Sequence, residues 1–333
     1  MAMRSGPALW ALAGLALLAA GSPRAQDVLA DDFDGTGFSA SGRLFYKNNA
    51  EQAAGAIRFQ SEVVRSGTGA LQLSVGESCP KDAPDCSERA EVWEKPSAHV
   101  PYLQGAWYGF SVKFGDPVPQ DDHRYLIAQW KRAILPGAAG DFSPLLALRL
   151  SRGKLFATVE TGPLETHPGS PAGCPSGEAP VFAAKSRQQV RALVATQADW
   201  NAEDGQLFKG CAAGIRIDGG GPLPAPTSGW IDFAIYSRPG PRGGGRIEII
   251  ANGARVASVS GQIGHEGEGL GADQYFKFGP YRAGGTGVWT MYYDSFRRGP
   301  RCEDVTEAKN CPPGTFSAAA HAACILRRTG SGA

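Results

Sequence analysis

Short stretches of alternating hydrophobic and polar residues dominate the sequence. In residues 71–75 leucine and valine alternate with glutamine and serine, and in residues 108–114 aromatic residues and valine alternate with glycine, serine and lysine. This period of two predicts strands that turn one face toward a core. Three further stretches follow the same pattern, namely 146–150, 155–160 and 231–236.

Turn signals separate these predicted strands. Ser151-Arg152-Gly153-Lys154 lies between two of them, and Asn252-Gly253 lies between 247–249 and 255–259. Asn-Gly is the strongest short-range signal for a two-residue β-hairpin. We expect an all-β fold, a sandwich or jelly roll of two antiparallel sheets, in which only Ser186 to Ala195 suits a helix.

The composition agrees with a turn-rich β protein. Glycine supplies 45 and proline 24 of 333 residues, which breaks any long helical pattern, and the glycines lack the period of three of collagen. With 42% hydrophobic residues and a formal net charge of +1, the chain is not of the disordered class. Its overall charge gives no reason to expect a nucleic-acid partner.

The N-terminus has the pattern of an export signal. Arg4 precedes an apolar run from Ala8 to Gly21, and cleavage is expected after Ala25 or, as the alternative, after Gly21. The run is too short to span the ~30 Å of bilayer hydrocarbon. We therefore expect residues 1–25 to be a signal peptide, the mature protein to be secreted or periplasmic, and no membrane association after cleavage.

Seven cysteines fit an oxidising compartment. Cys79 and Cys86 flank a short loop, and Cys174 and Cys211 flank the irregular middle of the chain, so we expect each pair to form a disulfide. One of the remaining three is left over or paired elsewhere; these are Cys302, Cys311 and Cys324. No Cys-x-x-Cys or spaced histidine pair supports a zinc site.

The sequence divides into three expected parts. A β domain over residues 26–300 follows the signal peptide, and a cysteine-containing tail over 301–333 follows the point where the alternation stops. Within the domain, Thr161 to Pro180 holds nine glycines or prolines in twenty residues. It predicts a long loop, either a lid or a plain surface insertion.

The neutral total charge hides uneven segments. Residues 26–88 carry a net charge of −5, residues 89–154 carry +3 and residues 275–301 carry +4. If the two basic segments lie on neighbouring strands, they form a cationic groove. The alternative is a set of solvated lysines and arginines scattered over the surface.

Each of two predicted strands places on one face side chains that could bind a carboxylate or a sugar ring. Arg89, Glu91 and Trp93 alternate and suit the binding of a carboxylate or a sugar ring, although a surface cross-strand ion pair gives the same pattern. Gln129 and Lys131 alternate likewise, and the alternative there is a strand end with a snorkelling lysine.

A third strand combines tyrosine and lysine. In Tyr275-Phe276-Lys277-Phe278-Gly279-Pro280-Tyr281-Arg282 the two phenylalanines are expected to face the core. Tyr275, Lys277 and Tyr281 then share the opposite face, which is unusual for pure packing.

These clusters resemble polysaccharide lyases of the heparin lyase I and glucuronan lyase type, and alginate lyases share the strand pattern. The matching segments are SERAEVW, YGFSVKF, IAQWK, WIDFAIYS, the Asn-Gly hairpin, YFKFGPYR and YYDSFRRG, in this order over roughly residues 30–300. The resemblance implies a concanavalin-like β-jelly roll sandwich with an anionic polysaccharide across its concave sheet.

The resemblance also implies a reaction, the β-elimination of a uronate-containing chain to give an unsaturated uronate end. Arg89 and Gln129 would neutralise the substrate carboxylate, and Tyr281 would be the acid and also a candidate base. Electrostatic stabilisation and proton transfer are what such an elimination requires. The substrate-binding residues would be Lys277, Tyr275, Glu91 and Arg282, with Lys277 binding substrate or tuning Tyr281.

One position departs from the family pattern. Many relatives have histidine after Gln-Trp, where this chain has Lys131. Lys131 could serve as the base or as a neutralising cation; alternatively Tyr281 performs both proton transfers in a syn elimination, or activity is lost. The five histidines fit no matching motif.

No cofactor is required for this chemistry, but folds of this kind often carry a structural calcium. Asp32, within an acidic turn, and Asp294 are candidate ligands for Ca²⁺. The alternative is an acidic turn and a separate buried aspartate.

Two other functions stay open at this point. One is a non-catalytic carbohydrate-binding module on the same scaffold. The other is a concanavalin-like glycoside hydrolase, which is less favoured because no strand carries the alternating pair of carboxylates that hydrolysis needs.

Overall fold

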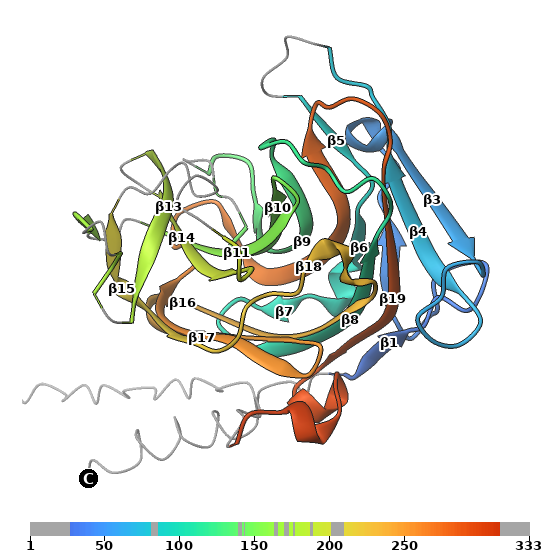
Figure 1. Cartoon of the computed structure of the whole chain (residues 1–333). Helices are drawn as coiled ribbons and strands as arrows, with labels where there is room; N and C mark the ends of the chain where they lie inside the picture. The colour runs from blue at the N-terminus through green and yellow to red at the C-terminus, as the bar shows by residue number, and fades with distance from the viewer. Residues whose placement is uncertain are drawn as a thin grey trace, which may run out of the picture.

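The computed structural model describes residues 27–80, 86–138, 142, 144–162, 166–169, 173–175, 177–186, 189–200 and 210–313. The described strands form two antiparallel layers (Figure 1). Sheet A contains β1 (Leu29–Asp31), β3 (Gly55–Gln60), β4 (Ala70–Val75), β8 (Ala106–Phe114), β12 (Thr166–His167), β15 (Cys211–Gly219), β16 (Ile231–Ala251), β17 (Ala254–Ile263) and β19 (Trp289–Gly299).

Sheet B faces it. Its strands are β2 (Leu44–Tyr46), β5 (Ser87–Arg89), β6 (Val92–Glu94), β7 (Val100–Pro101), β9 (Tyr125–Ile134), β10 (Leu146–Ser151), β11 (Lys154–Thr161), β14 (Gln189–Thr196) and β18 (Leu270–Ala283). β13 (Glu178–Ser186) pairs with β14 and with β15, so it joins the two sheets. Five 3₁₀ turns complete the described elements: η1 (Ala50–Gln52), η2 (Pro96–Ala98), η3 (Pro226–Ser228), η4 (Cys302–Asp304) and η5 (Ala308–Asn310).

Aromatic side chains from both sheets form the centre of the core. Phe276 and Phe278 of β18 are almost fully buried and pack on Phe110 of β8, with ring centroids 5.5 and 6.5 Å apart. Tyr293 of β19 lies 4.8 Å from Phe278 and donates its hydroxyl hydrogen to the carbonyl of Ile127 in β9. These contacts confirm the predicted sandwich and the predicted inward orientation of both phenylalanines.

The Asn-Gly hairpin is also confirmed. Asn252 and Gly253 have φ of 50° and 76° and connect β16 to β17. Both values lie in the left-handed region, which a type I′ turn requires at its two central residues and which asparagine and glycine tolerate best.

The predicted helix over residues 186–195 is wrong, because its described residues from Gln189 onward form the strand β14 (Gln189–Thr196) and Ser186 ends β13. β14 pairs with β11 and β13, and Val190, Ala192 and Val194 are buried on one face. The burial of these small and branched residues on one face of a sheet outweighs the helical propensity of Arg191 and Leu193 between them. The predicted loop over 161–180 is interrupted by β12 and ends where β13 begins.

Three disulfides lie within the described residues. Cys79–Cys86 and Cys174–Cys211 confirm the two predicted pairs, and Cys302–Cys311 closes the turn that contains η4 and η5. Cys302 and Val305 pack on Trp107 and Tyr236 of sheet A, which holds this turn against the outer side of β8 and β16 (Figure 1). Cys324 and the predicted signal peptide lie outside the described residues. None of the described helical turns has the length and apolarity to cross a bilayer.

Candidate active site

β18 positions the candidate site because it lies between β9 on one side and β5 and β6 on the other (Figure 1). Directly opposed residues of neighbouring strands share a face of a sheet. Lys277 lies opposite Trp93 and Gln129, and Tyr281 lies opposite Arg89. The sheet therefore brings three separate sequence clusters onto one face, the one turned away from the aromatic core.

A bulge sets the direction of Tyr281. The register with β9 shifts between Phe278 and Tyr281, and Gly279 has a φ of 127°. A Cβ atom at Gly279 would overlap the carbonyl oxygen of Ala90, so only glycine fits this close approach. Pro280 accepts a hydrogen bond from the Ala90 N–H at 2.9 Å, which fixes the bulge against the segment between β5 and β6.

Beneath this face lies a buried polar network. Lys277 Nζ is 2.7 Å from Glu91 Oε2, and Gln129 Nε2 donates to Glu91 Oε1 at 2.5 Å. Burial lowers the pKa of Lys277 to about 8; the Glu91 carboxylate opposes this shift and the charge of Lys131 adds to it. Glu91 thus holds a buried lysine and a buried amide in fixed positions.

Tyr281 is surrounded by cations. Its ring centroid lies 4.2 Å from the guanidinium carbon of Arg89, 5.2 Å from that of Arg124 and 5.9 Å from Lys277 Nζ. The Arg89 side chain is 20% exposed and approaches Glu91 at 4.0 Å, so it can meet a ligand while staying anchored. A partly exposed phenol among three cations suits proton transfer on an anionic substrate.

A cavity of about 440 Å³ opens next to this cluster. The Tyr275 ring stacks between Trp93 and His99 with centroids 5.4 and 5.1 Å away, and burial raises the pKa of the tyrosine. Lys47 Nζ lies 4.7 Å above the Trp93 ring, and Lys131 lines the same cavity. An aromatic platform with two lysines is suited to a sugar ring that carries a negative charge.

Arg282 takes a position different from the other predicted site residues. Its side chain is 2% exposed and its Nε donates to Glu88 Oε2 at 2.5 Å. Its guanidinium also donates to the carbonyls of Thr286 at 3.2 Å and Gly287 at 2.8 Å. The guanidinium of Arg282 therefore binds Glu88 and the turn after β18.

The two predicted calcium ligands are not brought together by any contact among the described residues. Asp32 binds the Arg297 guanidinium at 2.6 Å, and Asp294 accepts the backbone N–H groups of Arg65 and Ser66 at 2.9 and 3.1 Å. Burial raises the pKa of Asp294, although those hydrogen bonds oppose the shift. The calcium site stays a prediction.

One other group has metal-ligand chemistry within the described residues. His167, Glu178 and Cys211 place their ligand atoms within 4.8 Å of one another. The sulfur of Cys211 is bonded to Cys174, however, and His167 Nε2 lies 2.6 Å from Glu178 Oε2. The group is an ion pair beside a disulfide.

Arg149 of β10 is a candidate residue that the sequence reasoning missed. It lies opposite Leu126, which in turn lies opposite Tyr281, so all three are on the same face. Arg149 is 4% exposed and donates to Thr158 Oγ1 at 2.9 Å, and burial together with the charge of Arg191 lowers its pKa. The sequence signal for Arg149 was its polar position within the alternating run 146–150, which places it on the face opposite to the three leucines.

Comparison with known protein families identifies the family of this chain. The sequence model of the family described as polysaccharide lyase matches residues 39–297. The chain belongs to the polysaccharide lyase family. The matched residues include all three clusters that meet on sheet B, and they end within β19.

Two solved lyase structures are similar to this chain. An endo-β-1,4-glucuronan lyase from the fungus Trichoderma reesei superimposes with a TM-score of 0.53 at 15% identity, covering 85% of this chain and 98% of that chain. The alginate lyase Aly36B gives a TM-score of 0.37 at 14% identity, covering 82% and 97%. A comparison with curated protein sequences finds no match. The glucuronan lyase supports the β-sandwich fold of the polysaccharide lyase described here.

Proposed function

We propose that this polysaccharide lyase cleaves a uronate-containing polysaccharide by β-elimination on the outward face of sheet B. The observation that carries the proposal is the position of Tyr281, whose ring is bordered by Arg89, Arg124 and Lys277 at 4.2 to 5.9 Å. A uronate has a C5 proton next to its carboxylate, and the negative charge that develops on proton removal is stabilised by such cations.

Tyr281 performs both proton transfers in this proposal. Its phenolate oxygen takes the C5 proton, the electron pair of that bond forms the C4–C5 double bond, and the C4–O4 bond breaks. The new phenol then gives its proton to O4, which restores the phenolate. The register of β9 with β18 places Lys131 opposite Tyr275, whereas Leu126 is the residue of β9 opposite Tyr281.

Arg89 is the residue we assign to the substrate carboxylate. It is partly exposed and guanidinium groups bind carboxylates with two parallel hydrogen bonds. Gln129 is 2% exposed and donates to Glu91, so we assign it and Lys277 to positioning beneath the substrate. Lys131 and Lys47, in the neighbouring cavity, bind the carboxylate of an adjoining sugar.

Export is the second part of the proposal. The protein has three disulfides within its described residues, and disulfides form and persist in oxidising compartments. The N-terminal residues also have the pattern of a signal peptide. A polymeric anionic substrate would also be met outside the cytoplasm.

One assay tests the reaction. The mature protein is incubated with heparin, heparan sulfate, glucuronan, alginate and hyaluronan while the absorbance of unsaturated uronate is recorded. A rise on at least one polymer is expected. Binding without a rise would favour a carbohydrate-binding module, and new reducing ends without the chromophore would favour a hydrolase.

A further inference from the structure

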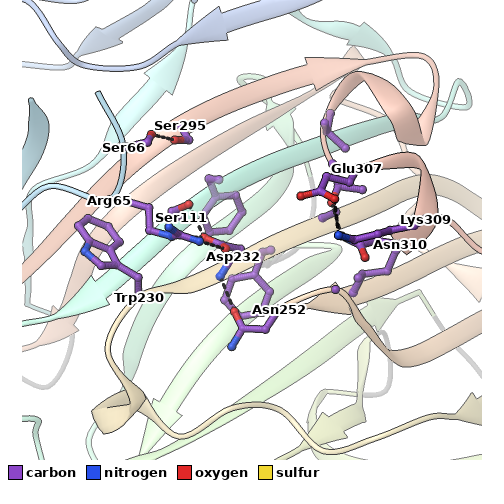
Figure 2. A pocket seen from close by; sticks show the side chains of 17 residues that line it. Arg65, Ser66, Ser111, Trp230, Asp232, Asn252, Ser295, Glu307, Lys309 and Asn310 are labelled. Atoms are coloured by element: carbon purple, nitrogen blue, oxygen red, sulfur yellow. Dashed lines mark hydrogen bonds and ion pairs between the residues drawn. The ribbon is translucent and has the colours of Figure 1, made fainter. Parts of the chain in front are cut away.

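The outward face of sheet A holds a second cavity, of about 830 Å³, on the opposite sheet from Tyr281. Figure 2 shows Ser111, Asp232 and Asn252 at its centre, Arg65 and Trp230 on one side, and Glu307, Lys309 and Asn310 on the other. The second wall belongs to the disulfide-closed turn that follows β19. The volume is within the range of small-molecule binding sites.

The centre of this cavity is rigid. Arg65 binds Asp232 through two parallel hydrogen bonds of 3.1 and 2.7 Å, and Ser111 donates to the same carboxylate at 2.6 Å. Burial raises the pKa of Asp232, but these hydrogen bonds outweigh it and keep the pKa below its ordinary value. The backbone N–H of Asp232 donates to Asn252 Oδ1 at 2.8 Å, which fixes the amide plane.

The charges of the cavity cancel in pairs. Arg65 offsets Asp232, and Lys309 Nζ lies 2.6 Å from Glu307 Oε2. The cavity thus differs from the cationic face of sheet B. Its chemistry favours an uncharged ligand rich in hydroxyl groups over an anionic one.

Two groups remain available to such a ligand. Trp230 is partly exposed at the wall. Within the part of the chain that the structure describes, neither its indole N–H nor the amide N–H groups of Asn252 have a hydrogen-bond partner. An indole ring offers an apolar face together with a donor, and a fixed amide offers two donors at defined angles.

We propose that this cavity binds a neutral oligosaccharide. One pyranose ring stacks on Trp230, and its hydroxyl oxygens accept hydrogen bonds from the Asn252 amide. Because the cavity lies on sheet A, it would hold the enzyme on an uncharged glycan while sheet B acts on a uronate chain. The inference does not depend on the β-elimination reaction.

The test is calorimetric titration of the full protein with cellohexaose, xylohexaose and mannohexaose. None of these has a carboxylate, so none is consumed by the proposed elimination. Saturable binding to at least one is expected, weakened about tenfold or more by Trp230→Ala and largely retained by Trp230→Tyr. The matched control is Trp200→Ala, which removes a tryptophan that packs on Phe156 of sheet B and should leave the affinity unchanged.

Two readouts separate this site from the active site. Turnover of a soluble uronate polymer should be the same in Trp230→Ala as in the wild type. The proposal is overturned if no neutral hexasaccharide binds saturably, if Trp230→Ala and Trp200→Ala bind equally well, or if the Trp230-dependent ligand proves to be a uronate oligomer.

Discussion

Lys277 and Glu91 form an ion pair of 2.7 Å in which both side chains are only 1% exposed. Such a pair is costly to desolvate and is stable only when its remaining hydrogen-bonding capacity is used. Gln129 donates to the second Glu91 oxygen, and the Glu91 backbone N–H donates to Gln52 at 2.7 Å. The pair therefore links β9 and β18 to the segment between β5 and β6, beneath the candidate site.

The pair makes a prediction about stability. Lys277→Met or Glu91→Gln alone should each lower the free energy of unfolding by about 3 kcal/mol or more, because each leaves one buried charge without its partner. The double variant should recover most of that loss. Guanidinium denaturation of the four proteins measures both effects, and equal losses that simply add in the double variant would show that the two residues are not coupled.

A second prediction concerns pH. The pKa of Lys277 is about 8 in the folded protein against an ordinary value of 10.5. Between these values the unfolded chain binds more protons, so the contribution of Lys277 to stability rises with pH over this window, by up to about 3 kcal/mol. Below pH 8 the full cost of burying the ammonium is present.

The reference for this titration is the Lys277→Met, Glu91→Gln double variant, which lacks both charges. The free energy of unfolding of the wild type, relative to that reference, should increase from pH 8 to pH 10.5. A flat difference across the window would mean that folding leaves the pKa of Lys277 unchanged.

A third prediction separates two roles for Lys131. If Lys131 binds substrate in the cavity beside Trp93, Lys131→Ala should raise KM about tenfold and leave kcat within a few-fold of wild type. Lys113→Ala, on β8 of the opposite sheet, is the matched control and should change neither constant. A large fall in kcat for Lys131→Ala would instead identify Lys131 as the base.

Much of the fold could be predicted because alternation along a strand reports which face is buried. The inward positions of Phe276 and Phe278 and the Asn-Gly hairpin followed from local sequence. The strand β14 did not, since its alanines and arginine are compatible with a helix until β11 and β13 provide partners.

The site could be predicted only in part. Alternation along a strand indicates which face of the sheet a side chain is on, but it does not indicate how deeply that side chain is buried. Alternation placed Lys277 on the same face as Tyr281, and the family resemblance added Gln129 to the site, but the Glu91 network buries both side chains below that face. Arg124 and Arg149 reach the site only through the register of β9 with β10 and β18, which no local pattern specifies.

The most direct measurement is the rate at which Tyr281→Phe produces unsaturated uronate on the best polymer of the panel. This change removes one hydroxyl and keeps the ring that contacts Arg89 and Arg124. We predict that kcat falls at least about 1,000-fold while the affinity for the polymer stays within a few-fold, since an acid–base group contributes on the order of 10² to 10⁴ per role. A Tyr281→Phe enzyme that retains wild-type kcat would contradict the assignment of Tyr281 as the catalytic residue.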